Sequence, residues 1–407
     1  MKQLRLAFIA VVAAGASVFA SAQQLRFDDV VRNLRNPDAK ARLSAVRLLR
    51  DAKYPEAIAP MAALVNDPVD EIQLETIAAE LSFFVGEEVK ARRMLGFVVE
   101  RRNPAVAGAA FDLGPAIVWP RTVPPELTAA LIQAIDDENA KVRLEAIYAV
   151  GVIGRSPLPD DQVQRLVKTL DHYDPAVRAA AARVVARLKI TQAGDALLKA
   201  INDSHAEVRY ASMRALGLIQ DTRAVAALTE QLAFYKKGEG AWSALDALAR
   251  LAQPSSASLF KERLTDKDPN IRRAAAEGLG RVRDKSALGQ LESGVTADES
   301  EMVRIAMAFA LQKLGRNYVT RIVDAMDSVR MVPQAQEYLV ELGPSITQSL
   351  YPRLQESDAS IREAVAEVLG IIGDAGAIPP LQTVTQDRDA NVANAAKRAV
   401  ERIKARS

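Results

Sequence analysis

The apolar positions recur with a helical period along almost the whole chain. After an aliphatic anchor residue, apolar or small side chains return at +3 or +4, +7 and +8, along one face of a helix. A second amphipathic segment fills the rest of each unit, as in 126–135, 162–170 and 224–232. Sustained alternation of apolar and polar residues, which is typical of strands, is absent from the sequence. The pattern therefore predicts an all-α chain built of helix pairs.

A short turn motif precedes the anchor in the regular units. Residues 174–178 read Asp-Pro-Ala-Val-Arg, and residues 266–272 read Asp-Lys-Asp-Pro-Asn-Ile-Arg. Aspartate caps the free N–H groups at a helix start, and proline fits the first turn. An apolar pair followed by glycine comes later in several units, as at Gly217 and Gly280, and we expect this glycine to end the helix in a left-handed conformation.

The motif repeats with a regular period. We place the anchors near positions 41, 72, 106, 142, 177, 208, 240, 271, 303, 331, 361 and 392, about 32 residues apart. The anchors at 41, 72, 106, 240 and 331 match the motif weakly and follow from the spacing. Since one helix pair cannot bury its apolar faces alone, we expect residues 23–407 to form one α-solenoid of about 11 to 12 stacked pairs, kinked at 114–125. Anchors such as Val177, Val208 and Ile271 should be buried between helices.

The turn motif, complete at 266–272 and partial elsewhere, resembles the HEAT-repeat family, in particular the short bacterial phycobilin-lyase type. The resemblance covers residues 25–405 and implies a HEAT-like superhelix. Such arrays mostly bind other macromolecules, and few are enzymes. The family also implies a structural ladder in which the repeated arginine binds a carboxylate or helix-end carbonyls of a neighbouring unit, while an anion-binding role is the alternative. The ladder arginines are Arg143, Arg178, Arg209, Arg272, Arg304 and Arg362.

The first 22 residues have the pattern of a signal peptide. Lys2 and Arg5 precede an apolar run over 6–18, and Ala20-Ser21-Ala22 supplies the small residues of a cleavage site before Gln23. A membrane anchor or a buried helix is the alternative. No later segment has about 18 uninterrupted apolar residues, so we expect no stable membrane insertion after cleavage. The mature protein is then exported, either periplasmic or secreted.

The charge balance changes once this segment is set aside. The 407 residues include 53 basic and 51 acidic side chains, and without Lys2 and Arg5 the numbers are 51 and 51. A neutral chain gives no whole-molecule argument for nucleic-acid binding. The sequence has no cysteine, which excludes disulfides, thiolate metal sites and cysteine nucleophiles.

The remaining candidate chemistry is weak. His172 and His205 lie one repeat apart in turns, with no second ligand nearby in the sequence. Residues 266–277 imitate a calcium loop, but Ile271 stands where that loop needs glycine. Phosphate-binding and nucleophile-elbow glycine motifs are missing. We therefore expect no catalytic residues, no metal and no cofactor.

The sequence predicts an exported, non-catalytic scaffold that binds a protein partner on its concave face. The alternatives are a lyase-like enzyme or enzyme subunit of the phycobilin-lyase type, and a structural spacer. Positions +1, +2 and +6 from each anchor should line the concave face, and in the central units they place Arg183, Tyr210, Arg214 and Arg273 there. These arginines would attract an acidic partner, or they are ordinary solvated residues.

Two irregular segments add two tryptophans to the candidates. Trp119 lies in 114–125 and Trp242 in 236–242, and these segments either bind a partner or are decayed repeats. The unit around Met331 also lacks the turn motif. The sequence leaves open the identity of the partner, the pathway and the oligomeric state.

Overall fold

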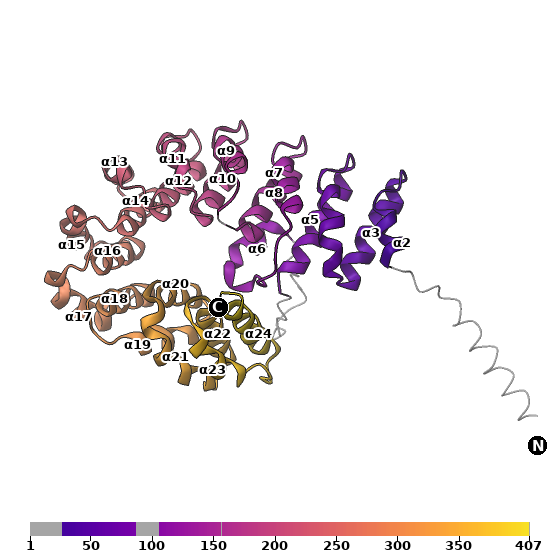
Figure 1. Cartoon of the computed structure of the whole chain (residues 1–407). Helices are drawn as coiled ribbons and strands as arrows, with labels where there is room; N and C mark the ends of the chain where they lie inside the picture. The colour runs from indigo at the N-terminus through magenta and orange to yellow at the C-terminus, as the bar shows by residue number, and fades with distance from the viewer. Residues whose placement is uncertain (1–26, 87–105, 156, 407) are drawn as a thin grey trace, which may run out of the picture.

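The computed structural model describes residues 27–86, 106–155 and 157–406. The expected signal peptide at 1–22 lies outside this range. Helices stack side by side in antiparallel pairs, and the array curves into an arc (Figure 1). The first helices α9, α11, α13, α15 and α17 lie on the convex side, and the second helices of these pairs line the concave side. The all-α solenoid expected from the apolar period is confirmed.

The second helices of the pairs begin near the repeated anchor positions. They are α3 (Ala39–Ala52), α5 (Asp70–Phe84), α8 (Ala140–Ile153), α10 (Pro175–Arg187), α12 (Ala206–Leu218), α14 (Gly238–Leu251), α16 (Pro269–Arg281), α18 (Glu301–Lys313), α20 (Val332–Leu342), α22 (Ala359–Ile372) and α24 (Ala390–Lys404). A further short helix, α6 (Ala107–Leu113), lies in the sequence between α5 and α7. The first helices are shorter and are α2 (Phe27–Asn33), α4 (Ile58–Met61), α7 (Pro125–Ala134), α9 (Asp160–Lys168), α11 (Gly194–Ala200), α13 (Val225–Tyr235), α15 (Ala257–Arg263), α17 (Leu288–Ala297), α19 (Val319–Asp324), α21 (Thr347–Leu350) and α23 (Ile378–Gln382).

Short 3-10 helices begin or end many of these elements. They are η2 (Pro55–Ala57), η3 (Ala62–Asn66), η4 (Pro115–Ile117), η5 (Thr169–Asp171), η6 (Thr191–Ala193), η7 (Thr222–Ala224), η8 (Pro254–Ser256), η9 (Lys285–Ala287), η10 (Ala325–Asp327), η11 (Gly343–Ile346), η12 (Tyr351–Gln355) and η13 (Ala375–Ala377).

The turn motif starts the second helices as the sequence predicts. The side chain of Asp174 accepts a hydrogen bond from the backbone N–H of Ala176 at 2.9 Å, and Asp268 accepts one from Asn270 at 2.8 Å. Each satisfies a backbone donor that the first helical turn would leave unpaired. Pro175 and Pro269 follow these caps, at a position where the missing N–H costs nothing.

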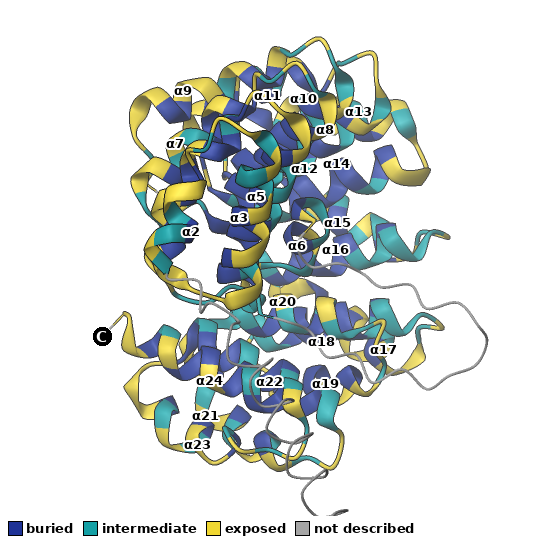
Figure 2. Cartoon of the chain, turned by 90° about the vertical axis from the view of Figure 1, so that its right-hand side faces the viewer, coloured by how far each residue is buried: buried dark blue, intermediate teal, exposed yellow. Residues whose placement is uncertain are grey.

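The anchor residues form the core between helices, as predicted. The anchors of the regular units are at most 6% exposed, and they are Val142, Val177, Val208, Ile271, Val303, Ile361 and Val392. Buried residues lie on the helix sides that face a neighbour, and exposed residues cover the outside (Figure 2). The core is therefore a continuous stripe along the array, with each pair covered by its neighbours.

The predicted helix-ending role of the repeated glycines is wrong. Gly217 and Gly280 lie inside α12 and α16, and neither has a positive φ. A Cβ on Gly280 would lie 2.6 Å from the Cα of Ala310 in α18, closer than carbon atoms can pack. Glycine is needed here because adjacent second helices touch backbone to backbone. The left-handed residues that follow these helices are not glycines: Gln220 and Arg283.

Gly280→Ala should therefore lower the free energy of unfolding by about 1–3 kcal/mol, because the added methyl group pushes α16 away from α18. Gly289→Ala in α17 is the matched control, since nothing lies within 4 Å of its Cβ. It should raise the stability by about 0.5–1 kcal/mol through the better helix propensity of alanine. Urea unfolding followed by circular dichroism measures both changes. Equal effects of the two substitutions would contradict the close packing.

The stretch between α5 and α7 interrupts the stacking. The amide of Asn66 donates to the carbonyl of Ala130 at 3.0 Å, and the amide of Gln73 donates to Asp137 at 2.7 Å. The α7–α8 pair thus packs directly on η3 and α5. The anchor predicted at position 106 is wrong, because Val106 is 43% exposed and precedes α6. The described part of this insertion, α6 and η4, packs on α8, α22 and α24 instead.

The insertion brings the two halves of the chain together. Arg402 of α24 donates to the carbonyls of Pro115, Ala116 and Val118 at 2.7–3.1 Å. Arg398 donates to Ala116 at 3.3 Å. The C-terminal helices consequently lie against the α6–η4 region (Figure 1), and the arc from α8 to α24 closes on itself. The segment 114–125, predicted as a kink, thus includes residues that contact the C-terminal helix.

Candidate functional site

The ladder arginines make the contacts that define the stacking. In the regular units the guanidinium binds an aspartate of the next unit through two nitrogens. Arg178 binds Asp203 at 2.7 and 2.9 Å, and Arg272 binds Asp298 at 2.8 and 2.9 Å. Arg362 binds Asp387 in the same way. The third nitrogen of each arginine donates to two carbonyls of its own turn. The fork of the guanidinium thus joins one turn to the next.

The ladder is interrupted beside the irregular segments. Arg209 keeps its bonds to its own turn but contacts the hydroxyl of Tyr235, where the next unit lacks the acidic turn. Arg304, which precedes the unit around Met331, has no carboxylate partner within the described residues. Arg143 is 3.5 Å from Asp174. At Arg209 and Arg304 the loss of the motif in the next unit therefore coincides with the loss of a ladder contact.

The ladder also sets the protonation of its acids. Hydrogen bonds from Arg362 hold the pKa of Asp387 below its ordinary value. At Asp203 and Asp298, burial opposes ionisation, but Arg178 and Arg272 outweigh it and the pKa is again lowered. These carboxylates are charged at neutral pH and occupied by arginine, which describes a structural contact.

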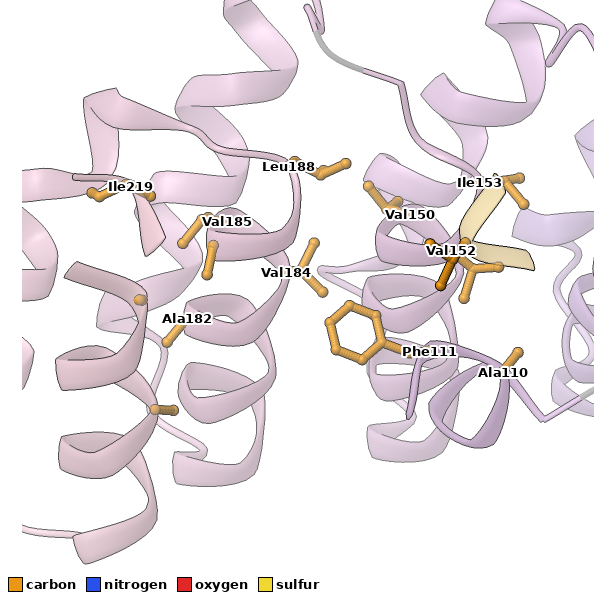
Figure 3. Close-up of a cluster of buried hydrophobic side chains, with 14 of the residues drawn as sticks. Ala110, Phe111, Val150, Val152, Ile153, Ala182, Val184, Val185, Leu188 and Ile219 are labelled. Atoms are coloured by element: carbon orange, nitrogen blue, oxygen red, sulfur yellow. The ribbon is translucent and has the colours of Figure 1, made fainter. Parts of the chain in front are cut away.

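A groove of about 550 Å³ runs along the concave side of α6, α8, α10, α12 and α14. Its walls include three of the predicted partner-binding residues, Arg183, Tyr210 and Arg214. Phe111, Tyr148 and Leu218 add apolar surface, and Leu218 is 41% exposed. Figure 3 shows Phe111 pointing from α6 toward Val184 of α10, so that this ring forms part of the core under the groove.

Arginine and aromatic side chains are layered along this groove. The Arg183 guanidinium lies 5.0 Å from the ring of Phe111 and 5.3 Å from that of Tyr148, whose hydroxyl accepts a hydrogen bond from it at 3.0 Å. Arg214 lies 4.9 Å from the Trp242 ring. The ring of Tyr210 meets that of Tyr235 edge to face at 5.6 Å. Such layered surfaces are rigid and carry both apolar area and hydrogen-bond donors.

Trp242 connects the groove to a buried charged cluster. Its ring contacts two guanidiniums, that of Arg214 and that of Arg273 on α16, which lies 5.7 Å from the ring centre. Arg273 is 3.5 Å from Glu277, a side chain that is 3% exposed. Glu277 also binds Arg281 at 3.1 Å and accepts a hydrogen bond from the hydroxyl of Tyr338 at 2.5 Å. Burial raises the pKa of Glu277, and these arginines oppose that effect.

The central arginines are not the free positive row that their sequence positions predicted. Arg183 contacts Asp112, Arg214 binds Glu239 at 2.8 Å, and Arg273 faces Glu277. Two of these acids come from neighbouring helices, Asp112 from α6 and Glu239 from α14. The middle of the concave face is therefore close to neutral, and its prominent feature is aromatic.

Trp119 lies apart from this group. Its backbone N–H donates to the carbonyl of Phe84 at 2.7 Å, beside an antiparallel contact between Val85 and Val118. Its ring is 6.0 Å from Arg398 of α24. Trp119 thus belongs to the closure between the insertion and the C-terminal helix.

Several residues of these surfaces were missed in the sequence. Tyr148 stands at +6 from the anchor Val142, the same offset that selected Arg183, so the rule could have found it. Phe111 and Leu218 carried no such signal. Of the two histidines, His172 has its ring 4.3 Å from that of Tyr173, tilted against it, and His205 is exposed. Within the described part of the chain, no group of three or more histidine or acidic side chains could hold a metal ion.

Helix pairs stacked through a buried stripe and an Arg–Asp ladder define an α-solenoid protein. Residues 163–233 and 238–312 match the HEAT repeats family, and residues 361–387 match the PBS lyase HEAT-like repeat. These segments thus have the sequence pattern of HEAT repeats, one of them of the PBS lyase type, as the turn motif predicted. A search of curated proteins found no match. No helix in the described ranges is long and apolar enough to span a bilayer.

Among solved structures, an engineered protein is 20% identical over 93% of this chain and 98% of its own, with a TM-score of 0.41. The complex of CpcE and CpcF of phycocyanin lyase from a Nostoc species is 19% identical, over 75% of this chain and 96% of the matched chain, with a TM-score of 0.35. Importin beta is 13% identical, over 93% of this chain and 57% of its own, with a TM-score of 0.38. Likenesses at this level carry no argument about function.

Proposed function

We propose that this protein is a non-catalytic scaffold that binds a protein partner along its concave groove. The observation that carries the proposal is the layered row of aromatic and arginine side chains over α6, α8, α10, α12 and α14. Aromatic residues and arginine are enriched where proteins bind one another, because they bury large areas with little loss of conformational freedom. HEAT repeats typically serve as protein-binding scaffolds, which supports the same conclusion.

The expected partner contact combines apolar and polar groups. Exposed Leu218 and the half-buried Tyr210 offer apolar surface, while Arg183 and Arg214 retain donors beyond their present bonds. Since these arginines are already paired with Asp112 and Glu239, a partner need not be strongly acidic to bind here. Tyrosine and arginine would supply hydrogen bonds at the rim of an apolar contact.

The test is capture of the partner by three versions of the full chain. Leu218→Glu places a charge in the groove at an exposed position, so the fold should survive. Phe234→Glu on α13, whose side chain is 74% exposed and does not line the groove, is the matched control. We expect the same partner to cross-link to the wild type and to Phe234→Glu. Its cross-linked amount should be at least tenfold lower with Leu218→Glu. Equal capture by all three would refute the concave groove as the binding surface.

We also propose that the protein works outside the cytoplasm, on the basis of the segment 1–22. The mature chain should begin at or near Gln23, because the small residues before it suit signal peptidase. Cell fractionation and N-terminal sequencing of the protein expressed with its full leader would measure this. Met1 at the N-terminus of the soluble protein would rule the proposal out.

A further inference from the structure

The closure between the insertion and the C-terminal helix encloses a second cleft, of about 950 Å³. Its walls come from segments far apart in the sequence: 115–125, the ends of α8 and α10, and the end of α24. Proline, valine and leucine side chains form much of the surface, with Phe84 at one side. Arg187 lines both this cleft and the concave groove, so the two cavities adjoin.

The charged side chains of this cleft all have one sign. It is lined by six basic residues and, within the described part of the chain, by no acidic residue: Arg121, Arg155, Arg187, Lys189, Arg402 and Arg406. The acids that act on them from outside are engaged elsewhere, since Glu367 binds Arg398 at 3.1 Å and Asp112 contacts Arg183. In a chain with nearly equal basic and acidic totals, this is a local excess of positive charge.

The basic side chains are held in place mainly by backbone carbonyls. Arg402 donates to three carbonyls through one terminal nitrogen, and Arg187 donates to the carbonyl of Phe111 at 2.9 Å. Each of these guanidiniums keeps further N–H groups. Among the described residues, the side chains of Arg121 and Lys189 make no hydrogen bond or ion pair. The guanidiniums of Arg402 and Arg187 are therefore fixed but not neutralised, and no described side chain neutralises Arg121 or Lys189.

Electrostatics supports this description. Burial and the nearby charges of Arg398, Arg406 and Arg155 lower the pKa of Arg402 to about 10. The part of this lowering of the pKa that burial does not cause comes from the neighbouring positive charges. An anion bound in the cleft would relieve the repulsion among these groups.

We propose that this cleft binds an acidic peptide segment that also carries apolar side chains. The occupant is argued from charge complementarity and from size, since the volume holds several residues rather than one small anion. Carboxylates would pair with the free N–H groups of the arginines, and apolar side chains would cover the proline and leucine walls. The site adjoins the concave groove of the proposed function at Arg187 and is otherwise lined by different residues.

The test uses the full-length mature chain and a fluorescein-labelled peptide of alternating glutamate and leucine. Fluorescence anisotropy at low salt measures its Kd. The double variant Arg121→Glu/Lys189→Glu should weaken binding at least tenfold, because both side chains are exposed and take no part in the closure. The variant Lys267→Glu/Lys285→Glu makes the same charge change at exposed positions outside the cleft and should bind nearly as the wild type does. Circular dichroism checks that both variants fold.

Four results would overturn the proposal. Unchanged binding by the Arg121/Lys189 variant, or an equal loss in the Lys267/Lys285 variant, would mean that the cleft is not the site. Tripolyphosphate binding more tightly than the peptide, and displacing it, would assign the cleft to a small phosphate ligand. Loss of peptide binding in Leu218→Glu alone would place the peptide in the concave groove. If Leu218→Glu instead keeps its peptide binding but no longer captures the partner, the cleft and the groove bind different molecules.

Discussion

Ile271→Asp is expected to lower the free energy of unfolding by about 3–5 kcal/mol, which for many domains approaches the whole stability. Ile271 is 2% exposed and lies in the first turn of α16. A carboxylate at this position loses its water and gains no partner, because the acid-binding Arg272 is already engaged with Asp298. Chemical unfolding of the wild type and the variant by circular dichroism measures the difference.

The damage should be confined to one part of the array. Each pair contacts mainly its neighbours, so α14, α16 and α18 should unfold in a separate, earlier transition. Lys267→Asp is the control, since it adds the same carboxylate four residues earlier, at an exposed position near the favourable helix N-terminus. It should change the stability by less than about 1 kcal/mol. A wild-type melt for Ile271→Asp would mean that the anchors have been assigned in the wrong register.

The regular units could be predicted because their signals are local. An aspartate cap, a proline in the first turn and an apolar stripe all act within one helix, and Asp268, Pro269 and Ile271 have the predicted roles. The glycine after the stripe was misinterpreted because one sequence cannot separate two uses of glycine. Gly280 allows close approach to Ala310 rather than a left-handed turn, and that contact joins residues one repeat apart.

The insertion could not be predicted because the spacing masks it. Ile72 and Val142 are 70 residues apart, close to two repeats of about 32 residues, so a missing unit looks like a weak one. The contact of Gln73 with Asp137 shows that α5 packs directly on the α7–α8 pair, without the insertion between them. The closure of α24 on residues 115–118 is also invisible in the sequence, since it depends on the accumulated curvature of the whole array.

The candidate site was predicted in part for the same reason. The +6 offset placed Arg183 and Arg214 on the concave groove, because an offset within one helix fixes which face a side chain takes. Their acidic partners lie on other helices, as with Glu239, and no period in the sequence relates them. A basic surface forms instead at the cleft, where residues far apart in the sequence, such as Arg121 and Arg402, line the same cavity.

The charged cluster around Glu277 provides the second large effect that we expect. Glu277 is 3% exposed and contacts Arg273, Arg281 and Tyr338, while α20 supplies Tyr338 from a unit that lacks the turn motif. Glu277→Ala removes the carboxylate and leaves two arginines partly buried with less compensation. We expect the free energy of unfolding to fall by about 3–5 kcal/mol, as when one partner of a buried ion pair is deleted.

The loss should also change the shape of the molecule. Tyr338 stacks at 4.4 Å on Phe309 of α18 and reaches Glu277 two units away, so this cluster holds α20 against the concave side of α16. Chemical unfolding gives the stability, and small-angle X-ray scattering gives the radius of gyration, which should increase as α20 detaches.

Glu292→Ala is the matched control, because Glu292 forms an exposed ion pair with Arg316 at 3.0 Å. Its removal should cost less than about 1 kcal/mol, since water screens exposed pairs. Similar small losses for Glu277→Ala and Glu292→Ala, with an unchanged radius of gyration, would show that the buried cluster does not hold the curvature of the array. The tight curl that brings α24 to the insertion would then depend on the backbone contacts between second helices, such as that of Gly280 with Ala310.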